Sequence, residues 1–173
     1  MKHFLLGALF LSLPVFAQET LKLSPEGIKP VVVELEGKSA TDMYITAKQW
    51  VNTYFNNPKR ALKAEIENDM IRVDGYCQDC FGIKAIAMIM YDYSYTLEIY
   101  FKDGKYKYDV QITKLSDDGA PLSYTYTAFY KNDGSLRKMY QKSVETMEAS
   151  LNETFTSFQD YMSGKTQKAK SDW

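Results

Sequence analysis

Two cysteines, Cys77 and Cys80, are the residues with the most specific chemistry in this sequence, because only two residues separate their thiols. In a cytosolic βαβ context this spacing suggests a thioredoxin-like redox pair. Here the pair follows Gly75 at a strand end and lacks the helix N-terminus that activates redox thiols. We therefore expect a structural disulfide formed in an oxidising compartment, with a redox pair or two reduced thiols as the alternatives.

Two carboxylates, Glu98 and Asp109, are expected to face each other across the outer side of a hairpin. Opposed carboxylates can act as a general acid and base, or can bind a hard cation. In the alternative arrangement Lys107, diagonal to Glu98, neutralises them in a solvated surface. We expect this second arrangement, and we assign no catalytic residue, metal ligand or cofactor.

Tyrosine is abundant, with 14 copies among 173 residues. Side chains of this type usually fill the core face of a sheet and reach its rim with their hydroxyl groups. A stacking platform for a ligand is the functional alternative. The candidate aromatic binding rim comprises Tyr91, Tyr93, Tyr124 and Tyr126.

The first 17 residues are typical of a secretory signal peptide, and they contain the single histidine, His3. A short basic start precedes an apolar run at residues 4–16, and Ala17 is the small residue that a signal peptidase reads. We expect cleavage before Gln18 and export to the periplasm or another compartment outside the cytoplasm. Loss of the histidine would exclude Ser-His-Asp and Cys-His catalysis and histidine-ligated zinc.

Charge and length also restrict the possible partners. The net charge is −1, and removal of Lys2 with the signal makes the chain more acidic, which argues against a nucleic-acid partner. The apolar run is too short to cross a membrane, so we expect no transmembrane segment after cleavage. The expected divisions are a signal peptide at 1–17, an irregular segment at 18–29, one domain at 30–164 and a flexible tail at 165–173.

A strand and a helix should open the domain, at residues 31–35 and about 40–56. Ser39 is a good N-cap, and Asp42 three residues later completes a capping box. Apolar residues then recur at helical spacing, which places Trp50 at the centre of a buried face. The sequence Asn56-Asn57-Pro58 should end this helix.

Strands dominate the middle of the chain. A first hairpin is expected to turn on Asn68-Asp69 and to pair Ile66 with Ile71. Residues 83–90 are apolar at both alternating sets of positions, which predicts a central or doubly covered strand.

The clearest hairpin turns on Asp103-Gly104 and pairs Phe101 with Tyr106 and Tyr95 with Ile112. One more strand is expected at 122–130, followed by a helix at 135–162 capped by Ser135. The fold class is therefore α+β: a strand, a helix, a curved antiparallel sheet and a long C-terminal helix, with both helices on one sheet face.

Three stretches of the sequence resemble a known family in its strand–helix opening and its later strands. They are Val31-Val-Val-Glu-Leu-Glu-Gly-Lys-Ser39 with Met43-Tyr44, Ala47-Lys-Gln-Trp50-Val51 and Phe55; Asp69-Met-Ile-Arg-Val-Asp-Gly75; and Tyr95-Thr-Leu-Glu-Ile-Tyr-Phe-Lys-Asp-Gly-Lys-Tyr-Lys-Tyr108. The family comprises exported bacterial domains of unknown function with a TATA-binding-protein-like fold, and the resemblance covers about residues 30–115. It implies a fold and an envelope location. Its motifs are structural, so it assigns no site residue.

Three functions follow from these observations as hypotheses. The first is a non-catalytic exported domain that binds an unknown envelope protein, a peptide or a ligand through its sheet or a sheet–helix cleft. The second is a helix-grip-like carrier of a small apolar molecule, which needs a cavity on the order of several hundred Å³ between the long helix and the sheet. The third is a carboxylate-based enzyme that uses Glu98 and Asp109. We expect the first and no enzyme activity.

Overall fold

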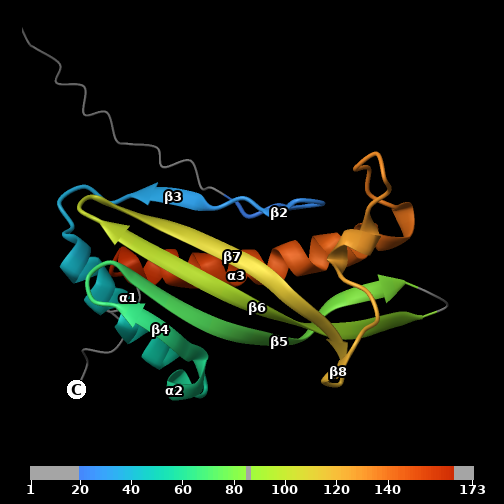
Figure 1. Ribbon diagram of the computed structural model, residues 1–173, viewed down its shortest axis with the longest axis horizontal. Helices are drawn as coiled ribbons and strands as arrows, with labels where there is room; N and C mark the ends of the chain where they lie inside the picture. Colours follow the sequence, from blue (N-terminus) through green and yellow to red (C-terminus); the bar gives the residue numbers. More distant parts are fainter. Residues whose placement is uncertain (1–19, 85–86, 166–173) are drawn as a thin grey trace, which may run out of the picture.

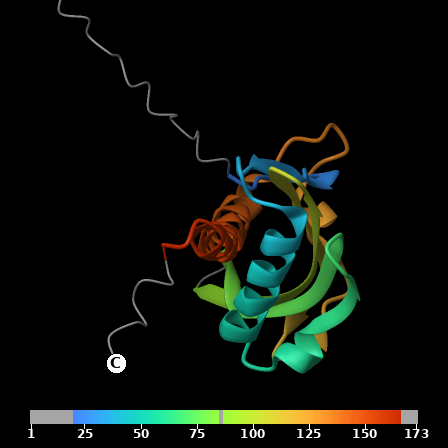
Figure 2. The same cartoon turned by 90° about the vertical axis from the view of Figure 1, so that its left-hand side faces the viewer.

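A curved antiparallel sheet with two helices across its concave face forms most of the molecule (Figures 1 and 2). The computed structural model describes residues 20–84 and 87–165. The expected signal peptide and residues 166–173 of the expected tail lie outside the described residues. The fold is α+β with a long C-terminal helix, as the sequence predicts.

The strands of the main sheet lie in the order β3-β7-β6-β5-β4, and β8 pairs with the end of β7. A separate two-stranded sheet precedes them. The strands are β1 (Leu23–Ser24), β2 (Gly27–Ile28), β3 (Val31–Glu34), β4 (Leu62–Ile66), β5 (Met70–Lys84), β6 (Met88–Lys102), β7 (Lys105–Asp117) and β8 (Ala120–Pro121). The helices are α1 (Ala40–Tyr54), α2 (Pro58–Ala61), the 3-10 turns η1 (Tyr126–Phe129) and η2 (Lys138–Tyr140), and α3 (Gln141–Met162).

The start of α1 follows the predicted capping. The Ser39 hydroxyl accepts a hydrogen bond from the Asp42 backbone N–H at 3.0 Å. The Ala40 N–H donates to the Asp103 carboxylate at 2.8 Å, which ties the start of α1 to the turn between β6 and β7. The helix ends at Tyr54, just before the predicted Asn-Asn-Pro break.

Aromatic side chains fill the space between the helices and the sheet. The Trp50 ring from α1 is buried and lies 5.0 Å from that of Phe158 on α3, centroid to centroid. The Phe158 ring also contacts Tyr106 and Tyr108 of β7, at 5.2 and 5.6 Å. These contacts join both helices to the centre of the sheet.

The hairpin of β6 and β7 has the predicted register. Phe101 pairs with Tyr106 and Tyr95 with Ile112, so the aromatic side chains lie on the concave face as expected. Glu98 and Asp109 are directly opposite each other on the outer face.

The hairpin of β4 and β5 differs from the prediction by one residue. Ile66 pairs with Met70 rather than Ile71, because the loop has three residues instead of two. Asn68 has a φ of 61°, a left-handed conformation that asparagine tolerates better than most residues. The Phe101 N–H also donates to the Asp69 carbonyl at 2.7 Å, which holds the longer loop against β6.

The predicted central strand at residues 83–90 is wrong. β5 ends at Lys84 and β6 begins at Met88, and Ile83 pairs with Ile89 at the end of this hairpin. Residues 83–90 contain no Gly, Pro, Asn or Asp, so no turn residue marks the reversal. The apolar pattern of this segment predicted that both faces of a strand are covered. In the structure the side chains of Met88 and Ile89 are exposed to solvent.

The predicted strand at 122–130 is also absent. The chain forms only β8 before that segment and η1 within it, with a single bridge between Tyr130 and Leu136. α3 begins at Gln141 rather than after Ser135, because the Ser135 N–H and hydroxyl both donate to Asp133 in a separate turn.

The described part of the segment expected to be irregular contains the β1–β2 hairpin, and its apolar side chains belong to the core. Asn152 of α3 accepts from the Leu21 N–H at 2.8 Å and donates to the Leu21 carbonyl at 2.9 Å. These two hydrogen bonds attach the segment to α3, and the side chains of Leu21 and Leu23 are buried in the core.

Candidate binding cleft at the edge of β5

The predicted disulfide joins Cys77 and Cys80, whose Cα atoms are 5.6 Å apart. It closes a bulge in β5: Cys77 pairs with Tyr93 and Phe81 pairs with Tyr91, so β5 has two extra residues at this point. No cysteine in the described residues is free. The pair lies within a strand, which is the context expected of a structural disulfide rather than a redox site.

Asp92 holds this bulge from the neighbouring strand, although only 2% of the residue is exposed. Its carboxylate accepts from the Tyr76 hydroxyl at 2.5 Å, the Asp79 N–H at 2.9 Å and the Gly119 N–H at 3.4 Å. Burial alone would raise the pKa of Asp92, but these hydrogen bonds outweigh it and hold the pKa below its usual range. The hydrogen bond to Asp92 raises the pKa of the Tyr76 hydroxyl to about 12.

The opposed carboxylates Glu98 and Asp109 each have a cationic partner. Arg72 of β5 forms an ion pair with Glu98, and Lys107 lies 3.7 Å from Asp109. The Tyr100 hydroxyl and then Arg72 hold the pKa of Glu98 below its usual range. A carboxyl with a lowered pKa is a poor proton donor near neutral pH, so the arrangement does not favour acid–base chemistry.

The four tyrosines of the candidate aromatic rim differ in burial. Tyr93 is a core residue, because it is buried and its hydroxyl lies 2.7 Å from that of Ser150. Tyr91 stacks on Phe81 at 5.5 Å, and it and Tyr124 are half-buried. Tyr126 belongs to η1 and is half-buried as well.

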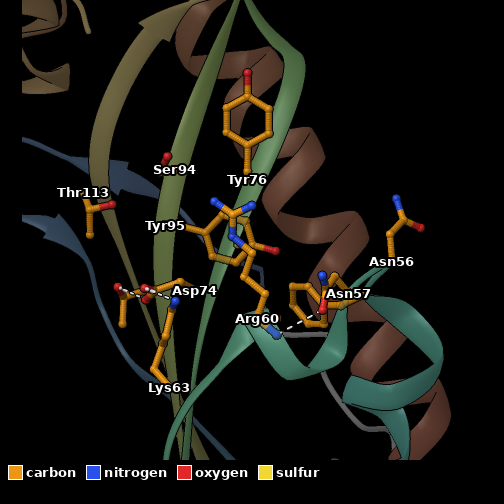
Figure 3. A pocket seen from close by; sticks show the side chains of 13 residues that line it. Asn56, Asn57, Arg60, Lys63, Asp74, Tyr76, Ser94, Tyr95 and Thr113 are labelled. Carbon is orange, nitrogen blue, oxygen red and sulfur yellow. Dashed lines mark hydrogen bonds and ion pairs between the residues drawn. The ribbon is translucent and has the colours of Figure 1, made fainter. Parts of the chain in front are cut away.

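A cleft that the sequence did not predict lies at the edge of β5, where β4 ends (Figure 3). Its volume is about 740 Å³. The loop after α1 and α2 form one wall, and β5, β6 and β7 form the other. The lining residues are Phe55, Asn56, Asn57, Arg60, Ala61, Lys63, Asp74, Gly75, Tyr76, Ser94, Tyr95, Thr96 and Thr113.

The chain path explains why the sheet is open here. β4 pairs with β5 only as far as the Leu62–Val73 pair, and α2 directs the chain away from the sheet before that point. Asn57 caps α2 by accepting from the Arg60 N–H at 3.2 Å, and Pro58 occupies its first turn. Among the described residues no strand pairs with β5 beyond Val73 on this side.

The far end of this edge is closed by α3. The Gly82 N–H donates to the Thr146 hydroxyl at 3.3 Å, and the Ser143 hydroxyl donates to the Gly82 carbonyl at 2.7 Å. Side-chain hydroxyls therefore take the place of a neighbouring strand at Gly82. The part of this edge that no described strand pairs with, and that precedes the disulfide bulge, runs along residues 74–77.

Gly75 and Tyr95 shape the inner wall of the cleft. A Cβ atom on Gly75 would lie 2.1 Å from Cζ of Tyr95, so the ring rests directly on the β5 backbone. Tyr95 is buried, and burial raises the pKa of its hydroxyl. The absence of a side chain at Gly75 is thus required for the ring to reach the cleft.

The mouth of the cleft is polar, and one of its cations, Arg60, has no ion-pair partner among the described residues. Lys63 lies 3.9 Å from Asp74, a loose ion pair between exposed groups. In the part of the chain that the structure describes, no carboxylate pairs with the guanidinium of Arg60. Figure 3 shows the Arg60 side chain reaching into the cleft. This site can hold an extended chain and can attract a carboxylate.

Residues 31–116 match the model of a family described as a domain of unknown function (DUF4468) with a TBP-like fold. These residues form a DUF4468 domain. The domain contains β3, α1, α2 and β4 to β7 up to Ser116. It therefore includes the disulfide and all the residues that line the cleft. The long helix α3 follows it in the chain.

Two solved structures share the fold of the DUF4468 chain. A crystal structure of a DUF4468 family protein from Bacteroides ovatus aligns with a TM-score of 0.63 and 13% identity, over 78% of this chain and 85% of that one. A crystal structure of a TBP-like protein from Parabacteroides distasonis aligns with a TM-score of 0.58 and 14% identity, over 78% and 91% of the two chains. No curated protein matches the sequence.

None of the lining residues was a candidate from the sequence. Two sequence features mark residues of the cleft, the Asn56-Asn57-Pro58 helix break and Gly75. Each indicates a local backbone feature and not a binding site. Neither feature shows that the break and β5 lie together, because that depends on where β4 stops. In the described residues no helix is long and apolar enough to cross a membrane.

Proposed function

We propose that this DUF4468 chain is a non-catalytic exported domain that binds an extended polypeptide segment along the free edge of β5. The observation that carries the proposal is the position of the cleft, which lies where β5 continues after β4 has ended. An extended segment there would add a strand to the sheet, as in other domains that recognise peptides by strand addition.

The length of the opening suits a short segment. Residues 74–77 precede the disulfide bulge, and each strand residue covers about 3.3 Å, so roughly four ladder positions are offered. Unpaired backbone groups at a sheet edge supply affinity, and the neighbouring cleft supplies side-chain selectivity. Phe55 and Tyr95 provide apolar surface within the cleft.

Arg60 defines the chemistry of the segment. Its guanidinium lines the cleft without an ion-pair partner among the described residues, and a guanidinium binds a carboxylate through two parallel hydrogen bonds. The segment should therefore carry an acidic side chain or a terminal carboxylate beside the strand-forming residues.

The alternatives receive less support. A helix-grip-like carrier would need room between α3 and the sheet, where the rings of Phe155 and Phe158 contact Tyr108 at 4.7 and 5.6 Å. A carboxylate-based enzyme would need a carboxyl poised near neutral pH, whereas the pKa of Glu98 is lowered.

Selection from a random peptide library tests the proposal, followed by fluorescence anisotropy with the selected peptides. We expect acidic, strand-forming sequences, and we expect Arg60→Ala to weaken their binding about tenfold, as the loss of a charge-assisted hydrogen bond does. Lys59→Ala is the matched control, because Lys59 is exposed on α2 but does not line the cleft. Equal effects of the two substitutions would contradict the proposal, and so would a library that yields no binder.

A further inference from the structure

Large apolar side chains are exposed together at the end of the β5–β6 hairpin. Met88, Ile89 and Met90 are 44%, 46% and 38% exposed, and Met139 of η2 is 58% exposed. We refer to these four residues as the methionine tip. In Figure 1 the hairpin extends past the end of α3 at the right of the molecule. A group of exposed apolar side chains of this size is typical of an interaction surface.

The backbone holds part of the tip in place. A Cβ atom on Gly82 would lie 2.5 Å from Sδ of Met88 and 3.1 Å from Sδ of Met90, so both thioethers rest on the glycine. Ile89 pairs with Ile83, and its side chain therefore lies on the opposite face from Met88 and Met90. The hairpin thus presents apolar side chains on both faces.

A stack of aromatic rings connects η2 to the base of the same hairpin. The Tyr140 ring, next to Met139, stacks on Phe129 at 4.6 Å, and Phe129 lies 6.0 Å from Phe81. Phe81 in turn stacks on Tyr91 of β6 at 5.5 Å. Met139 therefore belongs to the same end of the molecule as the hairpin.

Three cations are close in the chain to the residues of the methionine tip, and one of them, Arg137, donates from Nε to the Tyr130 carbonyl at 3.1 Å. Lys84 ends β5, and Arg137 and Lys138 stand directly before Met139, all three exposed. Within residues 20–84 and 87–165 none of these three forms an ion pair with a carboxylate. The chain as a whole has a net charge of −1, so this end differs in sign from the rest.

The carboxylates in the neighbouring segments are engaged or lie at the base of the hairpin, and Asp133 accepts from the Ser135 N–H and hydroxyl. Glu145 of α3 pairs with Lys142 at 3.4 Å. Asp117 ends β7 and Asp118 lies in the turn to β8, next to the Ser116–Asp92 pair at the base of the hairpin rather than at its end. The described residues Met88, Ile89, Met90 and Met139 at this end are apolar and exposed, and Lys84 and Lys138 beside them in the chain are basic and exposed.

We propose that the methionine tip docks this protein onto an anionic lipid bilayer surface. The Met and Ile side chains would enter the boundary between headgroups and acyl chains, and Lys84, Arg137 and Lys138 would contact the anionic headgroups. Flexible thioether side chains suit a surface that is itself irregular. The cleft at the β4 end of β5 would stay accessible, so this attachment is independent of the proposed polypeptide binding.

Co-sedimentation of the full chain with vesicles tests the inference. The probes are vesicles of phosphatidylcholine alone and of phosphatidylcholine mixed with phosphatidylglycerol. We expect binding to the mixed vesicles only, and release at high salt because ionic screening weakens contacts between exposed charges. Free glycerol phosphate at the same phosphate concentration should not release the protein, since apolar insertion needs a bilayer. Release by glycerol phosphate would overturn the proposal in favour of a simple anion site.

Substitutions locate the contact. We expect Met88→Ser with Met139→Ser to reduce vesicle binding at least fivefold, and Lys84→Gln with Lys138→Gln to do the same. Ile45→Ser is the matched control, because Ile45 is comparably exposed on α1, and it should leave binding unchanged. Thermal melts confirm that each variant is folded. Absence of vesicle binding by the native sequence would overturn the proposal, as would equal binding by all variants. A dimer in sedimentation velocity that Met139→Ser dissociates, without vesicle binding, would replace the bilayer with a second copy.

Discussion

At the scale of single residues, Gly75 determines the inner wall of the cleft, because the Tyr95 ring occupies the position that a Cβ atom would take. Gly75→Ala should lower the free energy of unfolding by about 1–3 kcal/mol, as overpacking of a filled core does. Gly82→Ala is the matched control and should cost less, since its Cβ would meet the ends of the flexible side chains of Met88 and Met90. Urea unfolding of both variants measures the difference, and equal costs would show that the Tyr95 ring moves freely.

Glu98 provides a prediction about pH. The Tyr100 hydroxyl and Arg72 lower its pKa, so the stabilisation is present above the pKa of the unfolded chain, about 4.3, and is lost as pH falls through the lower folded value. Glu98→Gln should therefore cost about 1 kcal/mol at neutral pH and almost nothing in acid, because it leaves Arg72 unpaired. Asp109→Asn is the control and should be close to neutral, since relief of the repulsion from Glu98 offsets the lost contact with Lys107. Urea unfolding from neutral to acid pH checks this; a Glu98→Gln variant as stable as the native sequence at neutral pH would contradict it.

The sequence predicted single residues where the contact was local. Glu98 and Asp109 face each other because the adjacent Asp103-Gly104 turn sets their register. The pairing of Glu98 with Arg72 was not predicted, because it depends on the β5–β6 hairpin, whose reversal no turn residue marks in the sequence. Arg60 was missed because its surroundings come from β5 and β6.

At the scale of elements, Trp50 is one of five buried side chains on α1, and it contacts α3 directly. Trp50→Ala should lower the free energy of unfolding by about 3–5 kcal/mol, because it empties the space beside Phe158 and removes the donor to the Ser157 hydroxyl at 3.2 Å. Ile45→Ala on the exposed face of α1 is the control and should change stability by less than about 0.5 kcal/mol. Thermal and urea unfolding measure both, and a change under about 1 kcal/mol for Trp50→Ala would contradict the role of the ring.

Two interactions stabilise the bulge in β5: the Cys77–Cys80 disulfide and the hydrogen bonds to the Asp92 carboxylate. Replacing Cys77 and Cys80 by serine should cost about 2 kcal/mol, and Asp92→Asn about 1–3 kcal/mol. The two costs should not add, since either change loosens the same segment, and contacting groups couple. A double-mutant cycle by urea unfolding measures the coupling, and additive costs would mean that Asp92 and the disulfide act separately.

Elements were predictable where turn residues or apolar periodicity marked them. The Asp103-Gly104 hairpin and α1 followed from such signals. The hairpin formed by β5 and β6 could not be predicted, because residues 83–90 contain no Gly, Pro, Asn or Asp. The register of β4 and β5 was predicted for a two-residue turn, and the three-residue loop at Asn68 shifts it by one residue. The strand predicted at 122–130 is absent, and η1 lies within this segment, in which Tyr124 and Tyr126 have the alternate spacing of a strand.

At the scale of the whole molecule, the two proposed surfaces lie at different ends of β5. The cleft opens beside residues 74–76, where β4 stops, and the methionine tip lies beyond the contact of α3 with Gly82. The α+β fold follows from local patterns that agree with one another, so the sequence predicts it well. The cleft arises from the length of one strand relative to its neighbour, a long-range property that local patterns do not contain.

Amide hydrogen exchange by NMR tests the central claim most directly, with the full chain free and bound to a library-selected acidic peptide. Strand addition predicts that amides of residues 74–77 that face away from β6 exchange rapidly in the free protein and slowly in the complex. The outer edge of β3, at the opposite side of the sheet, is the internal control and should exchange at the same rate in both states. Protection at β3 or at the loops, with residues 74–77 unchanged, would contradict the assignment of the β5 edge as the binding site.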